Sequence, residues 1–176
     1  MSIWICSLAA APQLVRQLKP ARVVSLLSPY DTFPVFDGFG SNIHLQVPIH
    51  DIVDDVGEWR APDLSDAESV IRFVQPWDRT APLLIHCWAG ISRSTASAFI
   101  TACLHNPEAD EKVIAQAIRD ASSTASPNPR LVAHADALLG RNGRMNRAIA
   151  GIGKGSAAME AQAFSIPSSY AAAHRS

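Results

Sequence analysis

Four short segments in the first half of the chain hold apolar or alternating residues between turn-forming positions. They are too brief for stable helices, so they predict strands at residues 3–6, 23–27, 43–47 and 83–85. Longer segments without helix breakers predict helices at residues 12–18, 65–75, 92–104, 109–121 and 129–139. A capping box of Ser65 and Glu68 is expected to begin the second helix. Because helices alternate with strands, we expect an α/β fold with a central, mostly parallel sheet flanked by helices.

The character of the chain changes near residue 142, after which Gly, Ala and Ser dominate and large apolar residues are few. We therefore expect one folded domain over residues 1–141 and a weakly ordered C-terminal extension over residues 142–176. The run Gly153-Lys154-Gly155-Ser156 is similar to a phosphate-binding loop, but it lacks the spacing and the preceding strand of a nucleotide site. We place no nucleotide site there.

Length and charge restrict the class of partner. A chain of 176 residues can bury its own core as a single domain. With 15 basic and 16 acidic residues, its formal net charge is −1, which gives no reason to expect nucleic acid or a membrane as partner. Oligomeric state does not follow from the composition.

Cys6, Cys87 and Cys103 are too few and too irregularly spaced for a disulfide framework or a CxxC metal site. A reducing compartment, and hence the cytoplasm, is the simpler expectation. No run of about 18 apolar residues is present, so we expect no membrane-spanning helix.

The segment His86-Cys87-Trp88-Ala89-Gly90-Ile91-Ser92-Arg93-Ser94 lies between a predicted buried strand and a predicted helix. A loop that wraps from a strand into a helix N-terminus directs successive backbone N–H groups at one point, where the helix dipole adds positive potential. Gly90 permits the tight turn, and the planar guanidinium of Arg93 can bind two phosphate oxygens. We therefore predict a phosphate-binding loop made by residues 88–92 and Arg93.

The same positive field favours a thiolate at Cys87, which would then be a nucleophile at neutral pH. Ser94 can donate its hydroxyl to that sulfur, and His86 can hold the loop through a hydrogen bond without touching substrate. A lone cysteine in an apolar segment is more often a core residue, which is how we interpret Cys6 and Cys103.

The pattern HCxxGxSRS over residues 86–94 resembles the signature of the cysteine-dependent protein tyrosine and dual-specificity phosphatases. The resemblance implies a compact phosphatase domain, attack of the Cys87 thiolate on phosphorus, a phosphocysteine intermediate and its hydrolysis by water. It implies no metal and no cofactor. A weaker resemblance is Ser126-Pro127-Asn128-Pro129, which is similar to the Pro-Asn turn of dual-specificity phosphatases and gives Asn128 a supporting role.

The resemblance also implies an aspartic acid that protonates the leaving oxygen, on a mobile loop before the cysteine. Asp51, Asp54 and Asp55 all lie in the acidic loop after the third predicted strand. We favour Asp51, because in the smaller members the acid comes just after such a strand. Spacing alone leaves Asp54 and Asp55 open.

The expected substrate is a phosphorylated protein, with phosphotyrosine favoured and phosphoserine, phosphothreonine or a small phosphate ester left open. A lipid substrate is disfavoured because residues 88–92 include no lysine. Two alternatives remain: a pseudophosphatase that binds phosphate without turnover, and a rhodanese-like sulfurtransferase. The remaining histidines have no metal-ligand spacing, so we expect surface or packing roles for His44, His50, His105 and His134.

Overall fold

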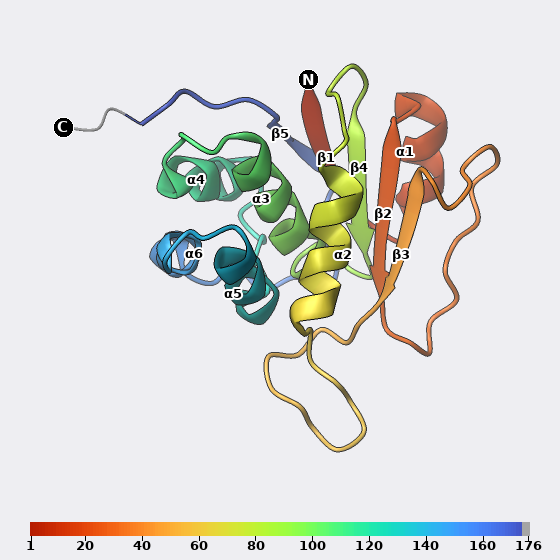
Figure 1. Ribbon diagram of the computed structural model, residues 1–176. Coiled ribbons are helices and arrows are strands. Elements are labelled where there is room, and N and C mark those ends of the chain that lie inside the picture. Colours follow the sequence, from red (N-terminus) through yellow and green to blue (C-terminus); the bar gives the residue numbers. More distant parts are fainter. Residues whose placement is uncertain (174–176) are drawn as a thin grey trace.

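The computed structural model describes residues 1–173 (Figure 1). Its strands are β1 (Ser2–Ser7), β2 (Arg22–Leu27), β3 (His44–Pro48), β4 (Leu83–Cys87) and β5 (Phe164–Pro167). Its helices are α1 (Ala11–Leu18), α2 (Leu64–Val74), α3 (Arg93–His105), α4 (Glu111–Ala121), α5 (Pro129–Leu138) and α6 (Arg144–Ile152).

The strands form one sheet in the order β3-β2-β4-β1-β5. The three pairs among β1 to β4 are parallel, and only β5 runs antiparallel, at the edge beside β1. All five residues of β4 are buried, as expected for a central strand with an uninterrupted apolar sequence. The predicted α/β fold with a mostly parallel sheet is confirmed.

Helices cover both faces of the sheet unequally. Figure 1 shows α1 alone on one face, and α2 to α6 on the other. Eleven residues of α3 are buried, and many are small, so this helix can pack closely between the sheet and the outer helices. Within it, full burial of Phe99 contributes roughly 1.5–3 kcal/mol relative to exposure.

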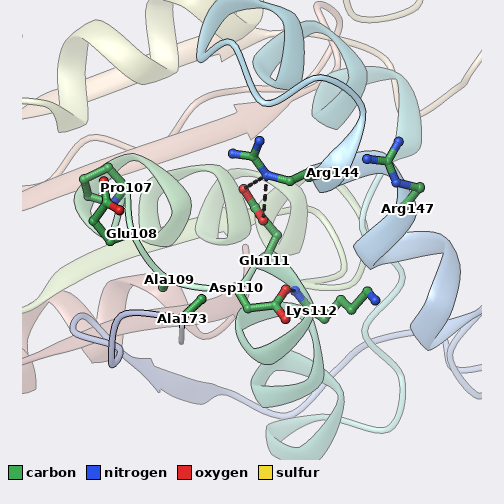
Figure 2. A pocket seen from close by; sticks show the side chains of 9 residues that line it. All are labelled: Pro107, Glu108, Ala109, Asp110, Glu111, Lys112, Arg144, Arg147 and Ala173. Carbon is green, nitrogen blue, oxygen red and sulfur yellow. Dashed lines mark hydrogen bonds and ion pairs between the residues drawn. The ribbon is translucent and has the colours of Figure 1, made fainter. Parts of the chain in front are cut away.

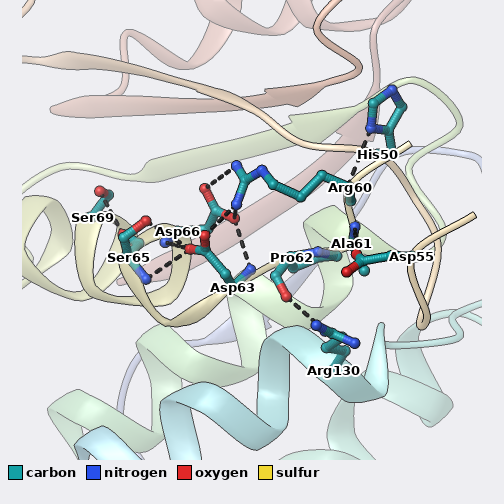
Figure 3. Close-up of polar contacts among 10 residues, drawn as sticks. All are labelled: His50, Asp55, Arg60, Ala61, Pro62, Asp63, Ser65, Asp66, Ser69 and Arg130. Carbon is teal, nitrogen blue, oxygen red and sulfur yellow. Dashed lines mark hydrogen bonds and ion pairs between the residues drawn. The ribbon is translucent and has the colours of Figure 1, made fainter. Parts of the chain in front are cut away.

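Helix α2 begins at a different cap from the one that the sequence suggested. The side chain of Asp63 accepts hydrogen bonds from the backbone N–H groups of Ser65 (2.9 Å) and Asp66 (3.1 Å). Asp66 in turn accepts from the N–H of Asp63 (2.8 Å), which completes a capping box (Figure 3). The predicted box of Ser65 and Glu68 is therefore wrong by two residues, because an aspartate can fill both positions as serine and glutamate do.

The structure corrects the expected weak order of residues 142–176 for the part that it describes. Residues 144–152 form α6, whose buried residues are Met145, Ala148 and Ile149. Arg144 Nε donates to the buried Glu111 Oε1 (3.0 Å), and Arg141 Nη1 donates to the same oxygen (3.1 Å), which ties α6 to α4 (Figure 2). A few buried apolar residues are enough to hold α6 against the core, because the ion pair with the buried carboxylate of Glu111 adds to the stability that their packing provides.

Strand β5 is the second element that the sequence pattern did not reveal. Its four residues pair with β1, and Phe164 and Ile166 are buried against the core. Four residues are too few for periodicity to show, so pairing with β1 decides the conformation. The boundary at residue 141 stays a prediction, and α6 and β5 nevertheless pack on the same core.

No helix within residues 1–173 is long and apolar enough to cross a membrane.

Candidate active site

The predicted phosphate loop lies at the carboxyl end of the central strand. Cys87 is the last residue of β4 and Arg93 the first of α3, so residues 88–92 wrap from strand to helix. Gly90 has φ of +73°, and a Cβ there would lie 2.8 Å from the carbonyl carbon of Cys6 and 2.9 Å from the nitrogen of Ser7. Glycine is therefore required both for the backbone conformation and for the close approach to β1.

Two backbone hydrogen bonds hold the outside of the loop. Leu8 N–H donates to the carbonyl of Trp88 (3.2 Å), and Ala161 N–H donates to that of Ala89 (2.9 Å). The loop is thus supported by the chain after β1 and by the segment before β5. The side chain of Trp88 is 52% exposed, at a position where it can line the mouth of the loop.

The sulfur of Cys87 is buried among hydrogen-bond donors. Gly90 N–H donates to Cys87 Sγ at 3.3 Å, and the hydroxyl of Ser94 lies 3.1 Å from the same atom. The other two cysteines lack such surroundings: burial raises the pKa of Cys6 to about 12 and also raises the pKa of Cys103.

Arg93 is almost completely buried and is held from the end of β3. Its Nη1 donates to the carbonyl of Ile49 at 2.9 Å, and its Nε lies 3.7 Å from Asp51 Oδ2. These contacts orient the guanidinium, so less side-chain entropy would be lost if it bound an anion.

Asp51 contacts the phosphate loop directly. Its Oδ1 accepts from Ser92 Oγ at 2.6 Å and from Asn128 Nδ2 at 3.2 Å. Three separate parts of the chain therefore meet around this carboxylate: the loop after β3, the junction of the phosphate loop with α3, and the turn before α5.

The other two candidate acids face elsewhere. Asp55 Oδ1 accepts from the backbone N–H of Ala61 at 2.7 Å, which closes its own loop (Figure 3). Asp54 has a side chain 89% exposed and lies 4.0 Å from Arg130. Of the three aspartates that the sequence left open, the structure brings Asp51 to the phosphate loop.

Asn128 links this carboxylate to a helix. Its Oδ1 accepts from the N–H groups of Arg130 and Leu131, both at 3.1 Å, and so caps α5. Its Nδ2 also donates to the carbonyl of Ile52 at 3.2 Å. The side chain of Asn128 therefore caps α5 and also donates hydrogen bonds to Asp51 and to the carbonyl of Ile52, which are contacts that suit the supporting role expected of it.

His86 lies beneath the loop in a buried polar network that the sequence did not reveal. Ser25 Oγ is 2.6 Å from His86 Nε2 and 2.8 Å from His44 Nε2. Burial lowers the pKa of His86 to about 4 and also lowers the pKa of His44, so both rings are neutral at pH 7. Ser25 pairs with His86 in the parallel register of β2 and β4, and a lone serine in a strand carries no signal of that contact.

Two further histidines, His50 and His105, each contact a backbone carbonyl. His50 Nδ1 lies 3.2 Å from the carbonyl of Arg60, and His105 Nε2 lies 3.0 Å from that of Val74. Among residues 1–173, no three His, Cys, Asp or Glu side chains are grouped so that they could hold a metal ion.

A cysteine at the end of a central parallel strand, followed by a loop that leads into the amino end of a helix, is an arrangement suited to binding an anion in an α/β protein. No family model matches the sequence, and no curated protein matches it either. Solved structures do match. DUSP15 superposes with a TM-score of 0.59 at 18% identity, over 84% of this chain and 89% of that one.

Human DUSP28 superposes with a TM-score of 0.59 at 19% identity, over 79% of this chain and 94% of that one. PTPMT1 in complex with PI(5)P gives 0.51 at 16% identity, over 84% of this chain and 89% of that one. The chain therefore has the compact dual-specificity phosphatase fold.

Proposed function

We propose that this protein is a phosphatase that hydrolyses phosphate monoesters through a cysteinyl-phosphate intermediate on Cys87. The observation that carries the proposal is the meeting of Cys87, Arg93 and Asp51 at one loop, with Ser94 3.1 Å from the sulfur and Asp51 3.7 Å from the guanidinium. A nucleophile, an anion-binding group and an acid are the three parts that the reaction needs.

Phosphate binding would use the backbone N–H groups of residues 88–92 and the guanidinium of Arg93. The amino end of α3 adds its dipole to this positive site. A bound phosphate would compete with Asp51 for Arg93. Its negative charge beside the carboxyl group would favour the protonated acid that the first step requires.

In the first step the Cys87 thiolate attacks phosphorus in line, a sulfur–phosphorus bond forms, and the bond from phosphorus to the leaving oxygen breaks. Asp51 gives its proton to that oxygen, so a neutral alcohol or phenol departs. In the second step Asp51 takes a proton from water, the resulting oxygen attacks phosphorus, and the thiolate leaves as inorganic phosphate forms. The Ser94 hydroxyl stabilises the departing sulfur.

The proposed substrate is a phosphorylated protein, with phosphotyrosine favoured over phosphoserine and phosphothreonine, and the proposed compartment is the cytoplasm. The two alternatives fit the site less well. A pseudophosphatase needs Arg93 and the loop amides alone, and would not explain why Asp51 meets them. A rhodanese-like sulfurtransferase does not need an arginine such as Arg93 placed between the phosphate loop and the carboxylate of Asp51.

The test is hydrolysis of an aryl phosphate in the presence of EDTA by wild type and by Cys87→Ser, with and without vanadate. We expect wild-type turnover that vanadate blocks and that Cys87→Ser loses, while the variant still binds vanadate. No turnover in wild type, with vanadate still bound, would favour the pseudophosphatase. Cyanide-dependent turnover of thiosulfate would favour the sulfurtransferase.

A further inference from the structure

We propose that a cavity beside Asp51 is a second substrate-binding site, in which Lys154 recognises an acidic side chain next to the phosphorylated residue of a peptide. The inference rests on the proposed function and adds a specificity-determining residue to it. It also gives a role to the Gly-Lys-Gly-Ser run, which does not form a nucleotide site.

The cavity has a volume of about 630 Å³ and shares residues with the proposed active site. Asp51, Ser92 and Asn128 line one part of it, and Lys154 lines it together with residues of α6. Because Asp51 would protonate the leaving oxygen, the leaving group must lie against this carboxyl group. The portion of a substrate that continues beyond the phosphorylated residue can therefore enter the cavity.

The backbone around Lys154 is anchored on both sides. Arg119 Nη2 donates to the carbonyl of Gly153 at 3.0 Å, and Ser156 N–H donates to that of Ser123 at 2.8 Å. Gly155 packs so tightly that a Cβ there would lie 2.4 Å from the carbonyl oxygen of Thr124. Only glycine fits, and the position of Lys154 at the cavity is set by contacts on either side of it.

The same contacts explain why this run is no phosphate loop. The N–H of Gly153 donates to the carbonyl of Ala150 at 3.1 Å, and that of Gly155 lies 3.4 Å from Ser126 Oγ. With the N–H of Ser156 also bonded, three of the four backbone N–H groups of this run have partners within the protein and are not free to bind a phosphate. The available charge is the side chain of Lys154.

The chemistry of the lining indicates what would bind. Apolar side chains make up much of the wall, and they are Val53, Pro127, Pro129, Ile149 and Ala150. Within residues 1–173, no carboxylate forms an ion pair with Lys154. One unpaired cation beside an apolar wall suits one acidic side chain, such as glutamate, which can pack its aliphatic stem against the wall and place its carboxylate beside the exposed lysine.

A peptide fits this site better than a membrane surface does. The loop that leads away from Asp51 bears the exposed acids Asp54, Asp55 and Glu58, which would repel an anionic bilayer. The phosphate loop adds no lysine to oppose them. Among the residues that line the cavity, Lys154 alone is basic, so it can select a single acidic residue.

The experiment compares phosphotyrosine peptides that differ only in a flanking Glu, Gln or Lys, placed before or after the phosphotyrosine. For wild type we expect kcat/KM about fivefold higher with Glu than with Lys on one of the two sides, the size of a favourable ion pair. Lys154→Glu should reverse that order. Lys112→Glu makes the same change of charge on α4, outside the cavity, and should keep the wild-type order.

An equal kcat/KM for the three peptides in wild type, or the same preference in Lys154→Glu as in wild type, would overturn the inference. Faster hydrolysis of a phosphoinositide in vesicles than of any peptide would overturn the assignment to peptides. Turnover of a plain aryl phosphate by wild type separates the two proposals. If wild type does not hydrolyse it, the proposed phosphatase activity is wrong. If wild type hydrolyses it but has the same kcat/KM for the three peptides, the proposed role of Lys154 is wrong.

Discussion

Asp51 illustrates how much at the residue scale depends on one carboxylate. It accepts from Ser92 and Asn128 and lies beside Arg93, so it joins the phosphate loop to two helices. The residue would serve both as acid and base in the reaction and as a link that orders the mouth of the site. These two roles can be separated by the leaving group of the substrate.

We predict that Asp51→Asn lowers kcat by about 10²- to 10⁴-fold for an alkyl or unsubstituted phenyl phosphate, and much less for a nitrophenyl phosphate. The reason is that a poor leaving group needs the proton and a good one does not. Asparagine has nearly the same shape as aspartate, so the variant can keep Arg93 ordered. The measurement is kcat against leaving-group pKa.

Asp54→Asn is the matched control, because that side chain is exposed and lies outside the phosphate loop, and its profile should follow wild type. A wild-type profile in Asp51→Asn together with lost activity in Asp55→Asn would show that the acid is Asp55.

At the scale of elements, the phosphate loop depends on its close packing against β1. The loop and strand meet at Gly90, where a side chain would collide with the backbone of Cys6 and Ser7. Backbone atoms of a paired strand cannot move aside as a flexible side chain can. The contact therefore fixes the distance between the loop and the sheet.

We predict that Gly90→Ala destabilises the fold by about 1–3 kcal/mol and also abolishes most of the phosphatase activity, because the loop must move away from β1. Gly38→Ala is the matched control: it has a similar positive φ of +82°, but a Cβ there meets nothing within 4 Å. Urea unfolding and aryl phosphate turnover measure the two effects. Equal losses of stability and activity in both variants would contradict a role for the contact with β1.

At the scale of the whole molecule, the neutral histidines His44 in β3 and His86 in β4 make the free energy of unfolding depend on pH. Burial lowers the pKa of His86 in the folded protein to about 4, against an ordinary value of 6.5. The unfolded chain therefore binds more protons between pH 6.5 and 4. Stability that is fully present above pH 6.5 is lost as the pH falls toward 4.

We predict that acidification from pH 7 to pH 4 lowers the free energy of unfolding by about 3 kcal/mol through His86. Urea unfolding at several pH values measures it. His86→Gln should be less stable at pH 7 but should show a smaller dependence on pH. An unchanged slope in this variant would show that His86 does not carry the effect.

Local sequence determined most of the elements and the part of the site that is continuous in the chain. Strands and helices follow from spacing, and residues 86–94 place the nucleophile, the glycine turn and the arginine within one strand–loop–helix unit. Such features depend on neighbours a few residues away, and their physical basis is the backbone geometry of that unit.

Tertiary structure alone decided the rest. Asp51 rather than Asp54 or Asp55 meets the phosphate loop because β3 ends at the same edge of the parallel sheet as β4, with β2 between them. Ser25 meets His86 because their strands pair in register. Residues 144–152 and 164–167 form α6 and β5 because Glu111 and β1 supply partners that a Gly/Ala-rich segment does not show by itself. These contacts join residues far apart in the chain, and packing of the whole fold, not local pattern, sets their distances.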